Sequence, residues 1–265
     1  MNPNYQVRLG KWLSEGWTML RQEWMAWTGI SALTFIPAGF VYIMIQMLIG
    51  RSLQIGPNES LTDYFLRSME SSFAVNMLTQ FAMVFIIAFF MGGAFRAAFR
   101  QIQGESISVS DAFSGVDIYV SVLVAMLSVS LFSMIGSMLC LFPGLIAQGL
   151  LYYVVPMVVR ENLPPLEALK KSFETTKSDW VMYTVLWIVT QVLAFLGILL
   201  CGIGIFITAP LIVTTTAAAY RDCFEIKTEE PISRVDALYS KSCIRCGASI
   251  DVRASFCDKC GASQV

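Results

Sequence analysis

Several stretches of this chain run for the length of a membrane span without a charged side chain. Six of them can be delimited: Ala26 to Gly50, Ala74 to Phe95, Tyr119 to Leu139, Pro143 to Val159, Trp180 to Leu200 and Ile203 to Tyr220. A helix of about 20 apolar residues crosses a hydrocarbon core ~30 Å thick, and a helix in lipid satisfies its own backbone hydrogen bonds. Only 14% of all residues are charged, against about 25% in soluble domains. The sequence therefore predicts an all-α integral membrane protein with six transmembrane helices.

Short turns rich in proline and glycine predict how these segments are connected. The third and fourth are joined by Cys140–Gly144 and the fifth and sixth by Cys201–Gly204, and such residues end a helix and reverse the chain. We therefore expect three helical hairpins. Of 18 Lys and Arg residues, only two lie in the predicted loop Arg51–Ser72, and the two turns hold none. Because cytoplasmic loops of membrane proteins are enriched in Lys and Arg, we expect both termini to be cytosolic.

A repeated amphipathic pattern precedes the hairpins. Leu13, Trp17, Arg21, Glu23 and Trp24 match Leu169, Phe173, Lys177, Asp179 and Trp180, each 156 positions later, and Val109–Phe113 begins a third, weaker copy. The apolar residues recur at helical spacing. The pattern predicts an interfacial amphipathic helix followed by a hairpin, used three times. Such helices either anchor in lipid and pack on the bundle or recognise a partner or an anionic headgroup.

The C-terminal region carries the most specific motif of the chain. Two Cys-x2-Cys pairs, each followed by glycine, comprise Cys243, Cys246, Cys257 and Cys260. Four thiolates complete a closed tetrahedral site for one structural Zn²⁺ ion, and in so small a domain the metal supplies the folding energy. Disulfides are the alternative, which a reducing cytosol disfavours. We therefore expect a transmembrane domain over 1–225, a linker over 226–242 and a zinc ribbon over 243–265.

The composition of the ribbon bears on its partners. Its basic residues Arg245, Arg253 and Lys259 are offset by Asp251 and Asp258, which argues against nucleic acid as a partner. A module that docks a cytosolic protein, or the chain's own helical bundle, is the expectation that remains. The other cysteines, Cys140, Cys201 and Cys223, do not form a ligand cluster in the sequence. Cys140 and Cys201 occupy equivalent places in the two turns and are interpreted as small buried residues, with a disulfide between them as the alternative.

The predicted spans offer little for catalysis. The chain contains no histidine, the commonest general base and metal ligand, and the spans lack the ionisable residues that mark proton relays. We therefore assign no catalytic residue. Four polar residues within spans are candidates for lining a permeation path: Asn76, Gln80, Gln148 and Gln191. Hydrogen bonds between helices are the alternative role for them.

Parts of the pattern resemble a known group of proteins. They are the opening Leu13–Trp17, the Pro143–Gly144 turn, and Val158–Asn162 leading into Glu167–Phe173. Over roughly residues 5–225 the chain resembles the membrane domain attached to glycerophosphodiester phosphodiesterases and its stand-alone relatives of unknown function. The tail is similar to short zinc ribbons appended to bacterial membrane proteins. The resemblance implies a prokaryotic cytoplasmic membrane; the phosphodiesterase barrel with its catalytic histidines is absent, so that activity is not implied.

These observations lead to two functional expectations. The first is a non-enzymatic membrane protein, a scaffold or regulatory subunit with a cytosolic zinc-ribbon docking module. The alternative is a transporter or lipid-handling permease with a path through the helical repeats.

Overall fold

The computed structural model describes most of the helical part of the chain and isolated pieces of the tail. The described residues are 7–50, 60–199, 204–224, 240–242, 246, 249–251, 256, 260 and 262–263. The chain divides into two compact domains, Met1–Glu225 and Ile226–Val265. We call them the helical domain and the C-terminal domain, and consider each by itself.

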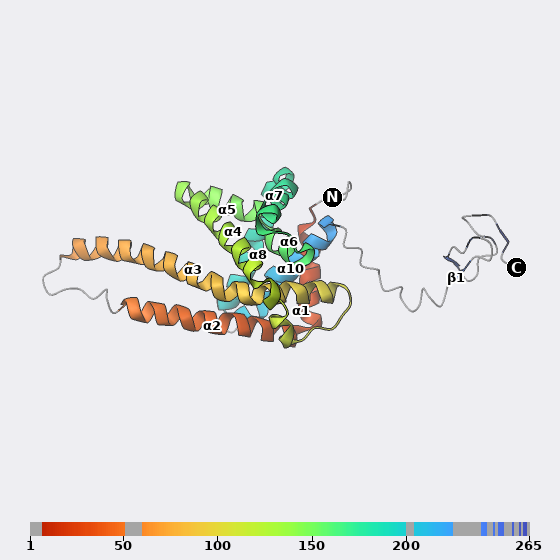
Figure 1. Cartoon of the computed structure of the whole chain (residues 1–265), viewed down its shortest axis with the longest axis horizontal. Coiled ribbons are helices and arrows are strands. Elements are labelled where there is room, and N and C mark those ends of the chain that lie inside the picture. Colours follow the sequence, from red (N-terminus) through yellow and green to blue (C-terminus); the bar gives the residue numbers. More distant parts are fainter. Residues whose placement is uncertain are drawn as a thin grey trace. The chain divides into compact units, whose positions relative to one another are not determined.

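Three units of helices make up the helical domain (Figure 1). The first unit contains α1 (Leu9–Gln22), α2 (Trp24–Gly50) and α3 (Leu61–Ile102). The second contains the 3₁₀ helices η2 (Val109–Phe113) and η3 (Val116–Ile118), then α4 (Tyr119–Leu139), α5 (Leu141–Leu150) and α6 (Val154–Glu161). The third contains α7 (Pro165–Thr176), the 3₁₀ helix η4 (Lys177–Asp179), α8 (Trp180–Leu199), α9 (Ile205–Thr208) and α10 (Pro210–Phe224).

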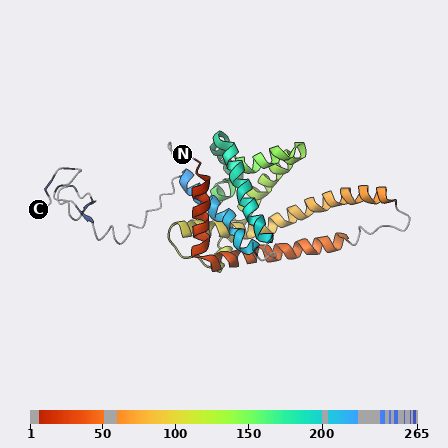
Figure 2. The same cartoon turned by 180° about the vertical axis from the view of Figure 1, so that it is seen from behind.

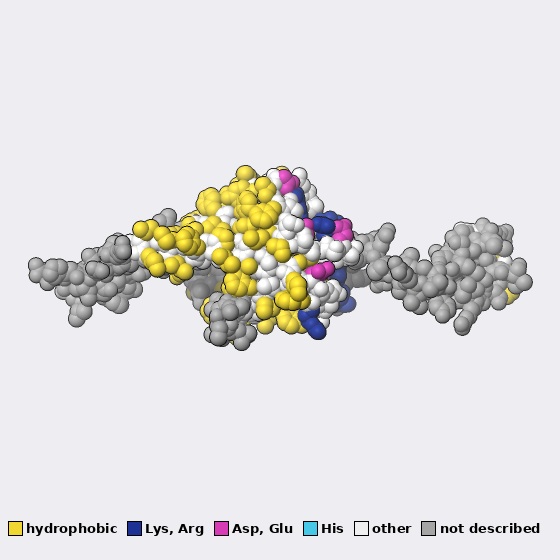
Figure 3. Space-filling view, turned by 90° about the horizontal axis from the view of Figure 1, so that it is seen from below, with side chains coloured by type: hydrophobic (Ala, Val, Ile, Leu, Met, Phe, Trp, Pro, Cys, Tyr) yellow, Lys and Arg dark blue, Asp and Glu magenta, His cyan; other side chains and the backbone are white. Residues whose placement is uncertain are grey.

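Membrane-spanning character is shown for a large part of this domain. Among the described residues, five helical segments are long and apolar enough to cross a membrane: Trp24–Ile45, Thr79–Ile102, Val109–Leu139, Phe142–Glu161 and Pro165–Gly197. Apolar side chains cover a broad part of the surface in Figure 3, and the charged side chains gather toward one end of it. The helices thus present to their surroundings the apolar surface that lipid requires. The chain is a membrane protein, and contact with membrane lipid is consistent with these apolar helices.

Several predicted boundaries are corrected by the structure. The loop Arg51–Ser72 is shorter than predicted, because α3 begins at Leu61. The turn Cys140–Gly144 reduces to Cys140, whose extended backbone (φ −169°, ψ 158°) separates α4 from α5. Pro143 lies in the first turn of α5, where the missing N–H of proline costs the helix nothing.

The predicted fourth and sixth segments are each interrupted. The fourth, Pro143–Val159, is divided at residues 151–153 into α5 and α6. The sixth, Ile203–Tyr220, begins outside the described residues and continues as α9 and α10, which separate at Ala209 because Pro210 has no N–H for the helix ladder. This last segment is not among the five that qualify as spans.

The three units form a closed ring. The first helix of each unit is predicted from the sequence to be interfacial, and we keep the name interfacial helix for it. It packs against the last helix of the preceding unit: η2 against α3, α7 against α6, and α1 against α10, so that the first unit closes on the third. The first long helices follow the same rule, since α4 contacts α3, α8 contacts α5 and α2 contacts α9. The last helices α3, α6 and α10 contact one another and therefore form the centre. Figure 2 shows α1 and α10 side by side, as their contacts require.

The interfacial helices are buried in the same pattern. In α1 the buried residues are Trp12, Gly16, Met19 and Leu20, and in α7 they include Ala168, Ser172, Thr175 and Thr176, each 156 positions later. Trp17, Phe113 and Phe173 occupy equivalent positions of the three units and are 45%, 47% and 47% exposed. The repeat in the sequence is therefore a repeat of packing, with one face of each interfacial helix against the ring and an aromatic side chain on the other.

An ion pair joins the units at each of the three junctions. Arg221 Nη2 lies 2.5 Å from Glu15 Oε2, and Arg100 Nη1 lies 2.6 Å from Asp111 Oδ1. At the third junction the signs are exchanged, because Lys171 donates to Glu161. Positions 15, 111 and 171 are equivalent in the repeat, as are 221, 100 and 161. We call these three pairs the charged rim.

The junction between α1 and α10 carries a further ionic network. Lys11 Nζ lies 2.7 Å from Asp222 Oδ2, to which Trp12 Nε1 also donates at 3.1 Å. Burial opposes ionisation of Asp222, but the hydrogen bonds from Lys11 and Arg221 outweigh it and hold the pKa of this carboxyl below its ordinary value. Asp222 is therefore charged at neutral pH and links the two ends of the ring.

Closure of the ring depends on a glycine that has no room for a side chain. A Cβ on Gly16 would lie 2.6 Å from Thr215 Oγ1 and 2.8 Å from Thr215 N, whereas a Cβ on Gly10, in the same helix, would meet nothing within 4 Å. We predict that Gly16→Ala lowers stability by about 1–3 kcal/mol because α1 must move away from α10. Gly10→Ala should be neutral or stabilise by up to about 1 kcal/mol, because it removes backbone freedom from a helix. Thermal unfolding of the purified protein in a neutral detergent measures both, and equal melting temperatures for the two variants would contradict closure at Gly16.

Candidate functional site in the helical ring

A cavity lies where the three last helices meet. Its volume is about 250 Å³, and its lining includes Met91 and Phe95 of α3, Tyr152 and Pro156 around the start of α6, and Ile212 and Thr216 of α10. The rest of the wall is formed by Leu151 and Val155, which are close to Tyr152 in sequence, and by side chains of α4, α5 and α8: Met126, Val129, Ser130, Gln148 and Trp187. We call it the axial cavity.

Its lining follows the repeat of the chain. Met91, Tyr152 and Ile212 are equivalent positions of the three units, and Phe95, Pro156 and Thr216 are equivalent positions one helical turn further along. Two layers of three residues therefore surround the cavity, with one residue from each unit in each layer. The cavity is therefore bordered by the last helices of all three units, and most of its other lining residues come from the second unit.

The next helical turn brings a third layer, formed by Phe99, Arg160 and Tyr220. These positions are also equivalent in the repeat. The rings of Phe99 and Tyr220 meet edge to face with centroids 5.5 Å apart, and the guanidinium of Arg160 lies 5.8 Å from the centroid of Phe99. The three side chains thus lie one helical turn beyond the second layer, on the side of the charged rim. We call them the closing layer.

Few polar groups face the axial cavity. The Thr216 hydroxyl donates to the Ile212 carbonyl at 2.6 Å, and its oxygen lies at hydrogen-bond distance, 2.9 Å, from Tyr152 Oη. Gln148 and Ser130 supply the remaining polar side chains of the lining. A mostly apolar cavity with a few placed polar groups is the usual form of a site for a small or amphiphilic molecule.

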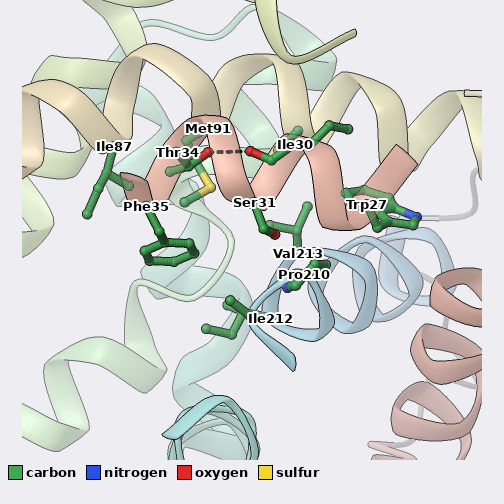
Figure 4. A pocket seen from close by; sticks show the side chains of 12 residues that line it. Trp27, Ile30, Ser31, Thr34, Phe35, Ile87, Met91, Pro210, Ile212 and Val213 are labelled. Carbon is green, nitrogen blue, oxygen red and sulfur yellow. Dashed lines mark hydrogen bonds between the residues drawn. The ribbon is translucent and has the colours of Figure 1, made fainter. Parts of the chain in front are cut away.

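A smaller cavity of about 70 Å³ adjoins the axial cavity (Figure 4). Side chains of α2, α3 and α10 point into it, and the hydroxyl of Thr34 donates within α2 to the Ile30 carbonyl at 2.9 Å. Met91 and Ile212 line both cavities. These two side chains therefore separate the axial cavity from the space beside α2, and Met91 is unbranched and flexible enough to change its rotamer.

The four polar residues predicted to line a path have different surroundings. Gln148 lines the axial cavity. Gln80 is exposed on α3 and Gln191 is half-buried on α8, and neither is part of the lining. The side chain of Asn76 lies outside the described residues. The four predicted residues therefore include one residue of the cavity lining and do not include Tyr152, Thr216 or the closing layer. Aligning the end of the first unit, Phe95–Arg100, with the end of the third, Thr216–Arg221, would have identified these positions from the sequence.

The described residues that flank the two Cys-x2-Cys pairs of the C-terminal domain pair in the same way. Strands β1 (Ser240–Ser242) and β2 (Ser249–Asp251) are antiparallel, with Ser242 opposite Ser249. Phe256 and Ser263 form a second antiparallel bridge. In both cases the residue before the first cysteine pairs with the third residue after the second cysteine. Two equivalent turns of this kind are suited to present four thiolates to one ion.

The predicted zinc ligands are only partly covered by the structure. Cys246 is exposed and Cys260 is partly exposed, whereas Cys243 and Cys257 lie outside the described residues. In the part of the chain that the structure describes, no group of three or more His, Cys, Asp or Glu side chains could hold a metal. The zinc site therefore stays a prediction, to which the matched register adds a structural reason. Of the other cysteines, Cys140 is exposed rather than buried as expected, Cys223 is buried, and Cys201 lies outside the described residues.

Comparison with known proteins gives distant relatives only. No family model matches the chain, and no solved structure matches it significantly. Three mycobacterial proteins, each named as an uncharacterized protein, are similar over 147 residues: one from Mycobacterium bovis and one from Mycobacterium tuberculosis at 24% identity, and a second from Mycobacterium tuberculosis at 23%.

The aligned region is 56% of this chain and 45% of each relative, so the chain spans about half the length of the curated relatives it matches. Their names state no ligand and no activity. What the comparisons add is that this helical membrane protein is similar over part of its length to proteins of mycobacteria.

Proposed function

We propose that the helical domain binds an apolar or amphiphilic molecule of the membrane in the axial cavity, as a lipid-handling protein or permease would. The observation that carries this proposal is the lining of the cavity by equivalent residues of all three units. A packing defect has no reason to follow the repeat, whereas a path through a ring of repeated hairpins runs along its axis. The proposal includes six spans with both termini in the cytosol of a prokaryotic cell, and kinship with the membrane domain of glycerophosphodiester phosphodiesterases.

The walls of the site favour lipid over an ion. Within the described residues, the ion pairs lie outside the lining of the axial cavity, which consists of uncharged side chains. Ion-coupled transport relies on ionisable groups within the membrane, and a hydroxyl nucleophile needs an adjacent general base, which none of the residues lining the cavity supplies. We therefore propose a non-enzymatic role.

The route by which a lipid enters is part of the same proposal. Met91 and Ile212 are shared by the two cavities, so movement of these side chains would join the axial cavity to the space between α2 and α10. A lateral opening between helices lets a lipid enter directly from the bilayer, so that its acyl chain does not pass through water.

The zinc ribbon favours a second candidate function, docking of a cytosolic protein. The matched register of the two cysteine turns supports one structural Zn²⁺ held by Cys243, Cys246, Cys257 and Cys260. With all four positions on the metal taken by thiolates, such a site is structural rather than catalytic. In this proposal the helical domain serves as a scaffold or regulatory subunit and the ribbon as its docking module.

We predict that filling the axial cavity displaces lipid. The full chain is reconstituted with a phospholipid that carries a photoreactive diazirine near the end of one acyl chain, and adducts are mapped by mass spectrometry. We expect adducts on cavity residues such as Met126 and Trp187, and their loss in Val129→Phe, because the added ring occupies the cavity. Val120→Phe makes the same change on an outward face of α4, where Val120 is 68% exposed, and should leave the adducts unchanged. Equal labelling of the cavity in both variants would refute an axial lipid site.

We also predict one zinc ion per chain, measured by elemental mass spectrometry of the purified full chain. Cys246→Ser and Cys260→Ser should each lower the zinc content severely, because a structural site binds with about 10–16 kcal/mol only when its ligand set is complete. Cys140→Ser, a change in the helical domain, is the matched control and should retain full zinc. Zinc content that is insensitive to both ribbon variants would overturn the assignment.

The docking role predicts a difference in affinity capture from native membranes. A partner should be retained by the intact protein and lost when Cys243, Cys246, Cys257 and Cys260 are all replaced by serine, and it should bind the purified intact protein directly. The same set of proteins recovered with both forms would remove the docking role and leave the lipid proposal unaffected.

A further inference from the structure

The closing layer contains a single cation in a place where the repeat has aromatic residues in the other two units. Phe99 and Tyr220 belong to the first and third units, and Arg160 occupies the equivalent position of the second. The guanidinium lies over the ring of Phe99, and such cation–π contact orients the cation without consuming its hydrogen-bond donors. Arg160 is also exposed, so its donors are accessible to a ligand.

The neighbouring charges are already engaged with one another. Glu161 accepts hydrogen bonds from both Lys171 and Tyr220, Arg221 pairs with Glu15 and Arg100 pairs with Asp111. None of the ion pairs within the described part of the chain includes Arg160. Among the described residues it is therefore the cation of the closing layer that no carboxylate neutralises, and its charge is available to an anionic ligand.

The side chains change from a charged guanidinium in the closing layer to apolar groups in the cavity lining within one turn of helix. Phe95 and Pro156, which line the axial cavity, precede the closing layer by four residues, and one helical turn rises about 5.4 Å. A molecule that reaches from Arg160 into the cavity must therefore carry an anionic group at one end and an apolar chain directly behind it. A free inorganic anion would satisfy only the first requirement, and an uncharged lipid only the second.

We propose that Arg160 binds the anionic head group of an amphiphile whose chain occupies the axial cavity. This inference rests on the proposed lipid-handling function and names the class of its ligand as an anionic lipid. The planar guanidinium pairs with the two oxygens of a carboxylate or of a phosphate, so the ligand is either a fatty acid or a lipid phosphate. Arg160 then determines specificity, while the apolar lining supplies affinity for the chain.

Competition against the photoreactive phospholipid tests the inference on the full chain in a neutral detergent. The competitors share one chain length and differ in head group: dodecyl phosphate, dodecanoate and zwitterionic dodecylphosphocholine, with inorganic phosphate as a chain-free control. We expect at least one anionic competitor to displace the label about tenfold more effectively than dodecylphosphocholine, the ratio expected for a hydrogen bond to a charged group. The better of the two anionic competitors distinguishes a fatty acid from a lipid phosphate.

Matched variants assign this preference to a residue. Arg160→Gln should abolish the tenfold preference while keeping the competition by dodecylphosphocholine, and Arg160→Lys should retain part of it. Lys170→Gln removes an exposed cation from α7 and should leave the preference intact. Thermal unfolding without added competitor verifies that the Arg160 variants are folded.

The outcomes separate this inference from the function on which it rests. An anionic preference that survives in Arg160→Gln overturns the role of Arg160 and leaves the lipid site in place. The inference is also overturned if every competitor, anionic or zwitterionic, displaces the label less effectively by the same factor in folded Arg160→Gln. The residue would then shape the cavity rather than select a charge. If the wild-type cavity is never labelled, the lipid-handling function itself fails. Displacement by inorganic phosphate as effective as by dodecyl phosphate would exclude an amphiphile.

Discussion

The close contact between α1 and α10 is the interaction on which the arrangement of the helical domain depends. Gly16 lets the backbone of α1 approach Thr215 to a distance that any side chain would prevent, and Arg221, Asp222, Glu15 and Lys11 form ion pairs beside it. Small residues at a helix contact allow such an approach where lipid offers no hydrophobic driving force. With this contact, three consecutive units become a ring, and α3, α6 and α10 meet at its centre. The axial cavity and its closing layer exist because the ring is closed.

The charged rim contributes selectivity to this assembly. Two junctions pair an acidic residue of the interfacial helix with arginine, and the junction of α7 with α6 uses the opposite signs. If α1 packed on α6, Glu15 would face Glu161, and if α7 packed on α10, Lys171 would face Arg221. Juxtaposed like charges are unfavourable. The exchanged pair therefore disfavours the incorrect orders in which three similar units could assemble, although each exposed pair alone stabilises the fold by no more than about 1 kcal/mol.

The sequence predicts the elements of this fold better than their faces. Long charge-free segments indicate membrane helices because lipid excludes charge, and repeated residues such as Trp17 and Phe173 indicate repeated interfacial helices. A helix that is apolar on every side has no periodicity to show which side faces inward. The sequence therefore cannot distinguish Gln80, Gln148 and Gln191 as candidates, although only Gln148 of these three lines the cavity. The closing layer was hidden for another reason. The first unit is longer than the others, so the spacing of 156 residues that aligns Trp17 with Phe173 fails to align Phe99 with Tyr220.

The contact between the first and last helices of the helical domain also bears on the order in which its units are connected in the sequence. Lys11 and Asp222 lie 2.7 Å apart at their charged atoms, although they are separated by nearly the whole helical domain in sequence. All three junctions are of the same kind, and only two of them are crossed by a covalent connection. The packing of the three units therefore does not require their order in the chain. A peptide link from α10 to α1, with new chain ends between α6 and α7, would produce a circular permutant of the helical domain in which every unit keeps the same neighbours.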